Sequence, residues 1–174
     1  MDAERITYIH ETVIRRLQND LMEKEIPTML QNATESNPEA LNYVLDGVGL
    51  DGDEVLVEAV FLPNSSEDFF HTFVTSVLIS DEINEEYLDE LIVAITILNF
   101  YIPMGGFLYS ASDKMLAYRN SAVSSFELSD EQIYSQSKLC IEKTHEMVDK
   151  YVEILLKISD GKSNTDELIG LFGY

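Results

Sequence analysis

Hydrophobic and polar residues follow two different periods along the chain. Near its start, apolar residues recur every three or four positions, the spacing of one helix face: Ile6, Ile9, Val13, Leu17 and Leu21. This spacing predicts an amphipathic helix. Pro27 ends or kinks the helix because proline lacks the N–H that a helix interior needs, and a loop containing Asn37-Pro38 is expected to follow.

Shorter segments rich in Val, Phe, Thr and Tyr are typical of β-strands. Asp51-Gly52 separates the first two of them, and Asp-Gly favours a hairpin turn. Gly105-Gly106 precedes the last two. We expect strands at residues 41–49, 54–62, 69–79, 107–111 and 115–121.

Residues 84–100 predict a second helix with apolar side chains on two sides. Acidic residues crowd its start, where the helix dipole favours negative charge: Asp81, Glu82, Glu85 and Glu86. One apolar stripe consists of Leu88, Leu91, Ile92, Ile95 and Leu98, and the other of Tyr87, Ala94, Ile97 and Tyr101. A helix that is apolar on two sides has two surfaces to cover. We expect the first stripe to pack on the sheet and the second to meet a second subunit.

A long third helix is expected near the end of the chain. Ser129 and Gln132 have the spacing of a capping box, which marks its start. Its apolar stripe ends near Gly161, a residue type that commonly terminates helices. Residues 165–172 predict one last short helix.

The order of these elements predicts an α+β fold. Short links favour an antiparallel sheet, so we expect a five-stranded sheet in the order α-β3-α-β2-α with helices packed on it. A chain of 174 residues corresponds to about one domain, and no repeat or linker divides it. The expected single domain covers residues 1–174, with a core at about 5–157 and a C-terminal extension at 162–174.

Two motifs resemble a known family. They are Asn99-Phe100-Tyr101-Ile102-Pro103-Met104-Gly105-Gly106-Phe107 and Leu116-Ala117-Tyr118-Arg119. With its element order, the chain resembles the fold of type III secretion chaperones and, more closely, the bacterial YbjN-type family of proposed sensory-transduction regulators. The resemblance implies a chaperone-like α+β domain, no catalysis, binding to protein segments, and often a homodimer formed through the second helix.

The charge of the chain narrows the choice of partners. It holds 11 Lys and Arg against 32 Asp and Glu, a net charge of −21, and residues 25–113 contain 17 carboxylates but no Lys or Arg. The negative electrostatic field of such a chain disfavours binding to nucleic acid, because the phosphates require a basic surface. It equally disfavours binding to anionic membranes. A surface selected for solubility explains the field most simply. The functional interpretation is a platform for a basic or amphipathic segment of a partner protein.

Other sequence features concern the compartment. No run of 18 apolar residues exists, and the start of the chain is acidic, unlike a signal peptide. The single cysteine, Cys140, cannot form an intrachain disulfide. We therefore expect a cytoplasmic protein that does not bind membranes.

Few residues of the sequence are candidates for catalysis or metal binding. His10 and His145 each precede a Glu, but Ile14 and Asp149 stand where an H-E-x-x-H zinc site needs its second His. His71 and Cys140 are expected to be packed in the interior. We expect no catalytic residue, no cofactor and no metal, and hence no enzyme.

Together these features predict a non-enzymatic, acidic protein-binding module, chaperone-like or regulatory, that forms a homodimer. Arg119 is expected to pair with an acidic helix or with a carboxylate of the partner. An alternative is a small-molecule- or metal-responsive regulatory protein with a pocket lined by Tyr and Phe between sheet and helices. The candidate partner-binding residues are Tyr87, Ala94, Ile97, Tyr101, Arg119, Glu85, Glu86, Asp89 and Glu90.

Overall fold

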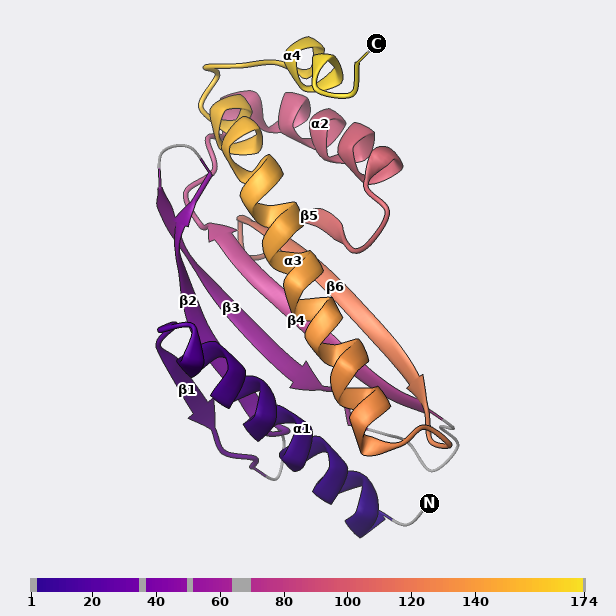
Figure 1. The fold of residues 1–174 in the computed structure, drawn as a ribbon. Helices are drawn as coiled ribbons and strands as arrows, with labels where there is room; N and C mark the ends of the chain where they lie inside the picture. Colours follow the sequence, from indigo (N-terminus) through magenta and orange to yellow (C-terminus); the bar gives the residue numbers. More distant parts are fainter. Residues whose placement is uncertain (1–2, 35–36, 50–51, 64–69, 174) are drawn as a thin grey trace.

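The computed structural model describes residues 3–34, 37–49, 52–63 and 70–173. Within these ranges, six strands form one antiparallel sheet in the order β1-β2-β3-β4-β6-β5 (Figure 1). The strands are β1 (Thr28–Gln31), β2 (Ala40–Val48), β3 (Asp53–Phe61), β4 (Phe70–Ser80), β5 (Gly106–Ser110) and β6 (Met115–Ser125). The helices are α1 (Ala3–Glu23), α2 (Leu88–Tyr101), α3 (Asp130–Ser159) and α4 (Thr165–Gly170), and a 3-10 turn, η1 (Glu85–Tyr87), precedes α2.

The predicted five-stranded sheet in the order α-β3-α-β2-α is wrong, although the structure is α+β with an antiparallel sheet. The additional strand is β1, which lies in the segment after Pro27 that was expected to be a loop. Its four residues pair with β2, from Thr28 opposite Tyr43 to Gln31 opposite Ala40. Four residues are too few to show a strand period, and this one forms because the edge of β2 offers it backbone partners. The predicted hairpin joins β2 and β3, but Asp51 of its turn lies outside the described residues.

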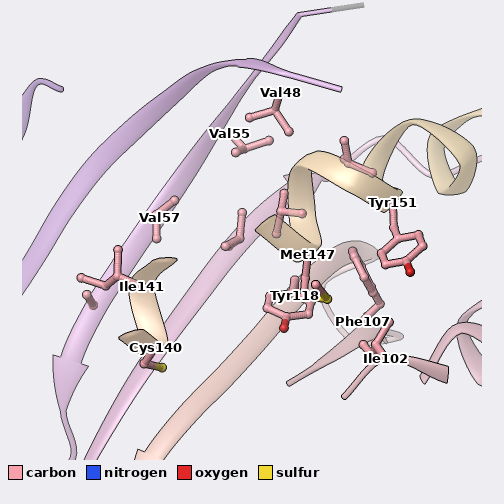
Figure 2. Close-up of a cluster of buried hydrophobic side chains, with 14 of the residues drawn as sticks. Val48, Val55, Val57, Ile102, Phe107, Tyr118, Cys140, Ile141, Met147 and Tyr151 are labelled. Carbon is pink, nitrogen blue, oxygen red and sulfur yellow. The ribbon is translucent and has the colours of Figure 1, made fainter. Parts of the chain in front are cut away.

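Helices α1 and α3 lie on one face of the sheet (Figure 1). Strand β3 shows the consequence, because its residues alternate strictly: Val55, Val57 and Ala59 are buried, whereas Glu54, Leu56 and Glu58 are exposed. The buried set faces α3 and α1 and belongs to one apolar core, part of which is drawn in Figure 2. We call the other side of the sheet the open face.

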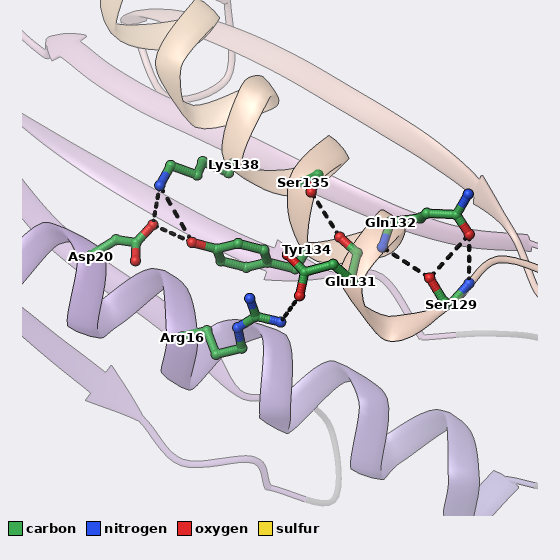
Figure 3. A network of polar contacts seen from close by, with 8 residues as sticks. All are labelled: Arg16, Asp20, Ser129, Glu131, Gln132, Tyr134, Ser135 and Lys138. Carbon is green, nitrogen blue, oxygen red and sulfur yellow. Dashed lines mark hydrogen bonds and ion pairs between the residues drawn. The ribbon is translucent and has the colours of Figure 1, made fainter.

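Polar contacts join the two helices above the sheet (Figure 3). Asp20 of α1 accepts hydrogen bonds from the Tyr134 hydroxyl and from Lys138 Nζ, the latter at 2.6 Å. Arg16 pairs with Glu131 at 2.8 Å and lies 3.7 Å above the centre of the Tyr134 ring.

The predicted capping box at the start of α3 is confirmed. Ser129 Oγ accepts a hydrogen bond from the backbone N–H of Gln132, and the Gln132 side chain accepts one from the Ser129 N–H (Figure 3). These bonds satisfy backbone donors that the first turn leaves free.

Candidate partner-binding surface

The residues of the Asn99–Phe107 motif build the corner between α2 and the edge strand β5. The Asn99 side-chain amide donates to the Phe107 carbonyl oxygen, and the Phe107 N–H donates to Asn99 Oδ1, both at 2.8 Å. At the free edge of β5, the Asn99 side chain therefore makes the two hydrogen bonds that a neighbouring strand would make.

The same corner explains the glycine and the tyrosine of the motifs. The Tyr118 hydroxyl donates to the Met104 carbonyl oxygen at 2.7 Å. Gly105 has φ +66°, and a Cβ there would lie 2.3 Å from that hydroxyl oxygen. Only glycine fits this position, so these motif residues have a structural role.

Helix α2 buries one side and leaves another side exposed. Leu91, Ala94, Ile95 and Leu98 are buried in the core. Phe100 is 83% exposed, Val93 49% and Ile92 44%. We call these three residues the α2 apolar face; Val93 and Phe100 are seven positions apart and lie on one side of the helix, and Ile92 borders that side next to Val93.

The second apolar stripe that the sequence assigned to a second subunit largely contacts its own chain. Ala94 is fully buried. The Tyr101 ring stacks on Phe172, just beyond α4, with 4.3 Å between ring centroids. Tyr87 packs against Gly161, where a Cβ would lie 2.3 Å from its ring. Ile97 is half-buried against the core, and partner binding by these residues stays a prediction.

The candidate carboxylates divide into two pairs. Glu85 forms an exposed ion pair with Lys114 at 2.5 Å, and that hydrogen bond lowers the pKa of the carboxyl. Glu90 Oε1 accepts a hydrogen bond from the Thr165 N–H at 2.9 Å, which lowers its pKa and holds the start of α4. Glu86 and Asp89 are exposed and form no ion pair with any described residue.

Arg119 lies on β6 between two buried residues, Tyr118 and Asn120. The Asn120 side chain points toward α3, where its amide donates to the Cys140 carbonyl oxygen at 3.3 Å. Successive strand residues point to opposite faces, so Arg119 is on the open face. In the described part of the chain it forms no ion pair with a helix, contrary to one of the two expectations.

The histidines are engaged inside the protein. His71 is fully buried, as predicted, and His10 Nε2 lies 2.8 Å from His71 Nδ1. His145 Nε2 lies 2.7 Å from the Tyr43 hydroxyl oxygen. Burial lowers the pKa of His10 and of His145 to about 4, so both rings are neutral at pH 7.

Other chemistry-bearing residues are packed as well. Cys140 is buried, and burial raises the pKa of its thiol to about 11, far from a reactive thiolate. Phe107 packs edge-on against Tyr118 and Tyr151 in the core (Figure 2). Among the residues described, no three or more His, Cys, Asp or Glu side chains are grouped to hold a metal ion.

A surface depression of about 380 Å³ is found on α1, lined by Glu4, Thr7, Tyr8 and Glu11. It is open to solvent and lies on the helix surface, not between the sheet and its helices. Regulation by a small molecule or a metal stays a prediction.

The α2 apolar face was missed in the sequence. Ile92 was assigned to the stripe that packs on the sheet, and Phe100 was considered only as part of a motif. The available signal was the unbroken apolar run over residues 91–95, which one contact surface cannot cover.

Neither a protein-family model nor a curated protein matches the chain. Among solved structures, the crystal structure of YbjN, a proposed transcription regulator from E. coli, is similar, with a TM-score of 0.44 and 10% sequence identity. The match covers 79% of this chain and 89% of that chain. The similarity is distant, and nothing proposed below rests on it. Within the described ranges, every helix is too short or too polar to span a lipid bilayer.

Proposed function

We propose that this protein is a non-enzymatic binding module, chaperone-like or regulatory, for a basic amphipathic segment of a partner protein in the cytoplasm. One observation carries the proposal: a highly acidic protein exposes the α2 apolar face, with Phe100 83% accessible. Clustered exposed apolar side chains on a soluble protein mark contact surfaces.

The energetics favour a contact of moderate strength. Complete burial of a side chain such as Phe or Ile contributes about 1.5–3 kcal/mol, and these residues are already partly covered. Loss of freedom on association offsets part of that gain. Electrostatic attraction therefore supplies much of the selectivity and of the association rate.

The chemistry of the partner follows from the surroundings of the face. Glu86 and Asp89 lie in the first turns of the helical segment that carries the face, and they are exposed without an ion pair to a described residue. An amphipathic helix with Lys or Arg beside its apolar side would cover the α2 apolar face and pair with these two carboxylates. Catalysis is not proposed, because the three histidines are engaged in contacts with their own chain and Cys140 is buried.

The test uses two labelled peptides with the same leucine positions at helical spacing, one with Lys and the other with Glu elsewhere. Fluorescence anisotropy should show that the Lys peptide binds and that added salt weakens its binding. Phe100→Ser should weaken it about tenfold, equivalent to ~1.4 kcal/mol.

Met22→Ser is the matched control, because Met22 is 57% exposed on α1, away from α2. It should leave binding unchanged. If Phe100→Ser and Met22→Ser bind the Lys peptide equally well, the α2 apolar face is not the contact surface and the proposal fails.

A further inference from the structure

We propose that the open face of the sheet binds a second copy of this chain, with Arg119 of each copy paired to Glu58 of the other. This surface is separate from the α2 apolar face, and the inference does not depend on the proposed function. It rests on three features of the open face: its exposure, the register of its strands, and the placement of two opposite charges.

The face is accessible on β3 and β6, the strands on either side of β4; on β4 itself Ser76 and Leu78 are half-buried and Val74 is buried. On β3, Leu56 is 48% exposed and Glu58 is exposed. On β6, Arg119 and Ser121 are exposed, and Val123 is 60% exposed. The helices contact the residues between these, on the other side of the sheet.

The register of the strands arranges apolar residues in a line across the open face. Neighbouring strands pair Val44 with Leu56, Leu56 with Leu78, Leu78 with Ala117, and Ala117 with Leu108. The line crosses five strands, roughly 19 Å at the usual strand spacing. Solvated faces of antiparallel sheets usually carry polar residues, so an apolar line on this face favours contact with another molecule.

The next line, two residues along each strand, is polar. It places Glu58 on β3, Ser76 on β4 and Arg119 on β6. Glu58 and Arg119 stand on either side of Ser76, about 9–10 Å apart at the backbone, and form no ion pair with each other. Arg119 is the only Lys or Arg in the six strands.

The charges of Glu58 and Arg119 determine which kind of partner can bind the open face. A contact that offers only basic side chains would place a like charge over Arg119, and one that offers only acidic side chains would place a like charge over Glu58. The surface requires a partner that offers a carboxylate over Arg119 and a cation over Glu58. A second copy of the same face offers both.

A twofold axis that lies between the two facing sheets, parallel to β4 and over Ser76, brings each Arg119 opposite a Glu58 of the other copy. The rotation places β3 of one copy over β6 of the other, so Glu58 meets Arg119 twice. In the apolar line it places Leu78 on Leu78, Leu56 opposite Ala117 and Val44 opposite Leu108. Such a contact is self-complementary, as twofold interfaces are, and aligned sheets pack in this way.

The test is sedimentation velocity from about 1 to about 200 µM protein, because association follows mass action. A salt concentration of about 0.15 M limits repulsion between two acidic copies. We expect a monomer–dimer equilibrium. Arg119→Glu alone and Glu58→Arg alone should each weaken the dimer at least about tenfold, because each leaves like charges facing.

The double variant Arg119→Glu/Glu58→Arg re-forms both pairs and should restore the dimer. Both positions are exposed, so far-UV circular dichroism should show all variants folded. Phe100→Ser is the control for the other surface and should dimerise like the parent. A monomer at every concentration, or a dimer that the single charge variants leave unchanged, would overturn the proposal.

Discussion

Each of the two faces of the sheet contains residues that burial alone would not suggest: polar side chains within the covered, mostly apolar face, and apolar side chains on the open face. On the face under α3, Thr75 and Asn120 are buried and pair with Thr144 of that helix. The open face contains an apolar line and an arginine without an ion pair to the described residues. The polar groups on the covered face orient α3 on the sheet, because each has a specific partner. On the open face, by contrast, Leu56 and Leu108 of the apolar line are exposed.

The largest expected difference between the faces concerns two leucines. Leu116 of β6 is fully buried under the helices, whereas Leu56 of β3 is 48% exposed on the open face. Leu116→Ala should lower the free energy of unfolding by about 2–5 kcal/mol, because it leaves a cavity in the core. Leu56→Ala should change it by less than about 1 kcal/mol in the dilute protein.

Urea unfolding of both variants at low protein concentration measures this difference. Equal losses in the two variants would mean that the open face is covered within the monomer, and the comparison between the faces would collapse.

The next effect concerns pH and the helix-covered face. The pKa of His145 is about 4 in the folded protein, against an ordinary value of 6.5. Because the unfolded chain binds this proton more readily, stability is present above pH 6.5 and is lost as the pH falls toward 4. Between pH 7 and pH 5 this one group should remove about 2 kcal/mol.

His145→Gln keeps a hydrogen-bonding group near the Tyr43 hydroxyl and removes the titration. The variant should therefore lose less stability than the parent between pH 7 and pH 5, as measured by urea unfolding. If both proteins lose the same amount, His145 is not buried as a neutral ring.

The smallest effect concerns the buried hydroxyls. Thr144 Oγ1 donates to the Cys140 carbonyl oxygen at 2.8 Å and lies 2.6 Å from Thr75 Oγ1. Thr144→Val should cost about 1–1.5 kcal/mol, because the Thr75 hydroxyl then lacks its oxygen acceptor. Thr75→Val should cost less, because Thr144 retains the Cys140 carbonyl.

The two threonine changes should also be non-additive, with Thr144→Val less harmful when Thr75 is already Val. Ser121→Val on the open face is the control and should stay within about 0.5 kcal/mol. Strict additivity in thermal or urea unfolding would show that the two hydroxyls are not a pair.

Much of the fold was predictable because it depends on local periodicity. The helical spacing from Ile6 to Leu21 and the capping box at Ser129 correspond to α1 and the start of α3. Strand β1 was missed because four residues carry no period, and its pairing with β2 depends on a contact across the fold.

The candidate site was less predictable for a related reason. Periodicity showed that α2 is apolar on two sides, but not that Phe172 would stack on Tyr101 and cover one of them. The line on the open face joins residues from five strands, including Val44 and Leu108. Only the strand register brings them together, and register depends on long-range pairing.

Covalent footprinting of side chains in dilute and in concentrated protein tests the account most directly, because it reports the two exposed surfaces separately. We predict that Leu56 and Leu108 are labelled in dilute protein and protected at about 200 µM, where mass action favours the dimer. Phe100 should be labelled equally under both conditions, and Leu116 under neither. Labelling of Leu56 that is independent of concentration, or protection confined to Phe100, would contradict the account.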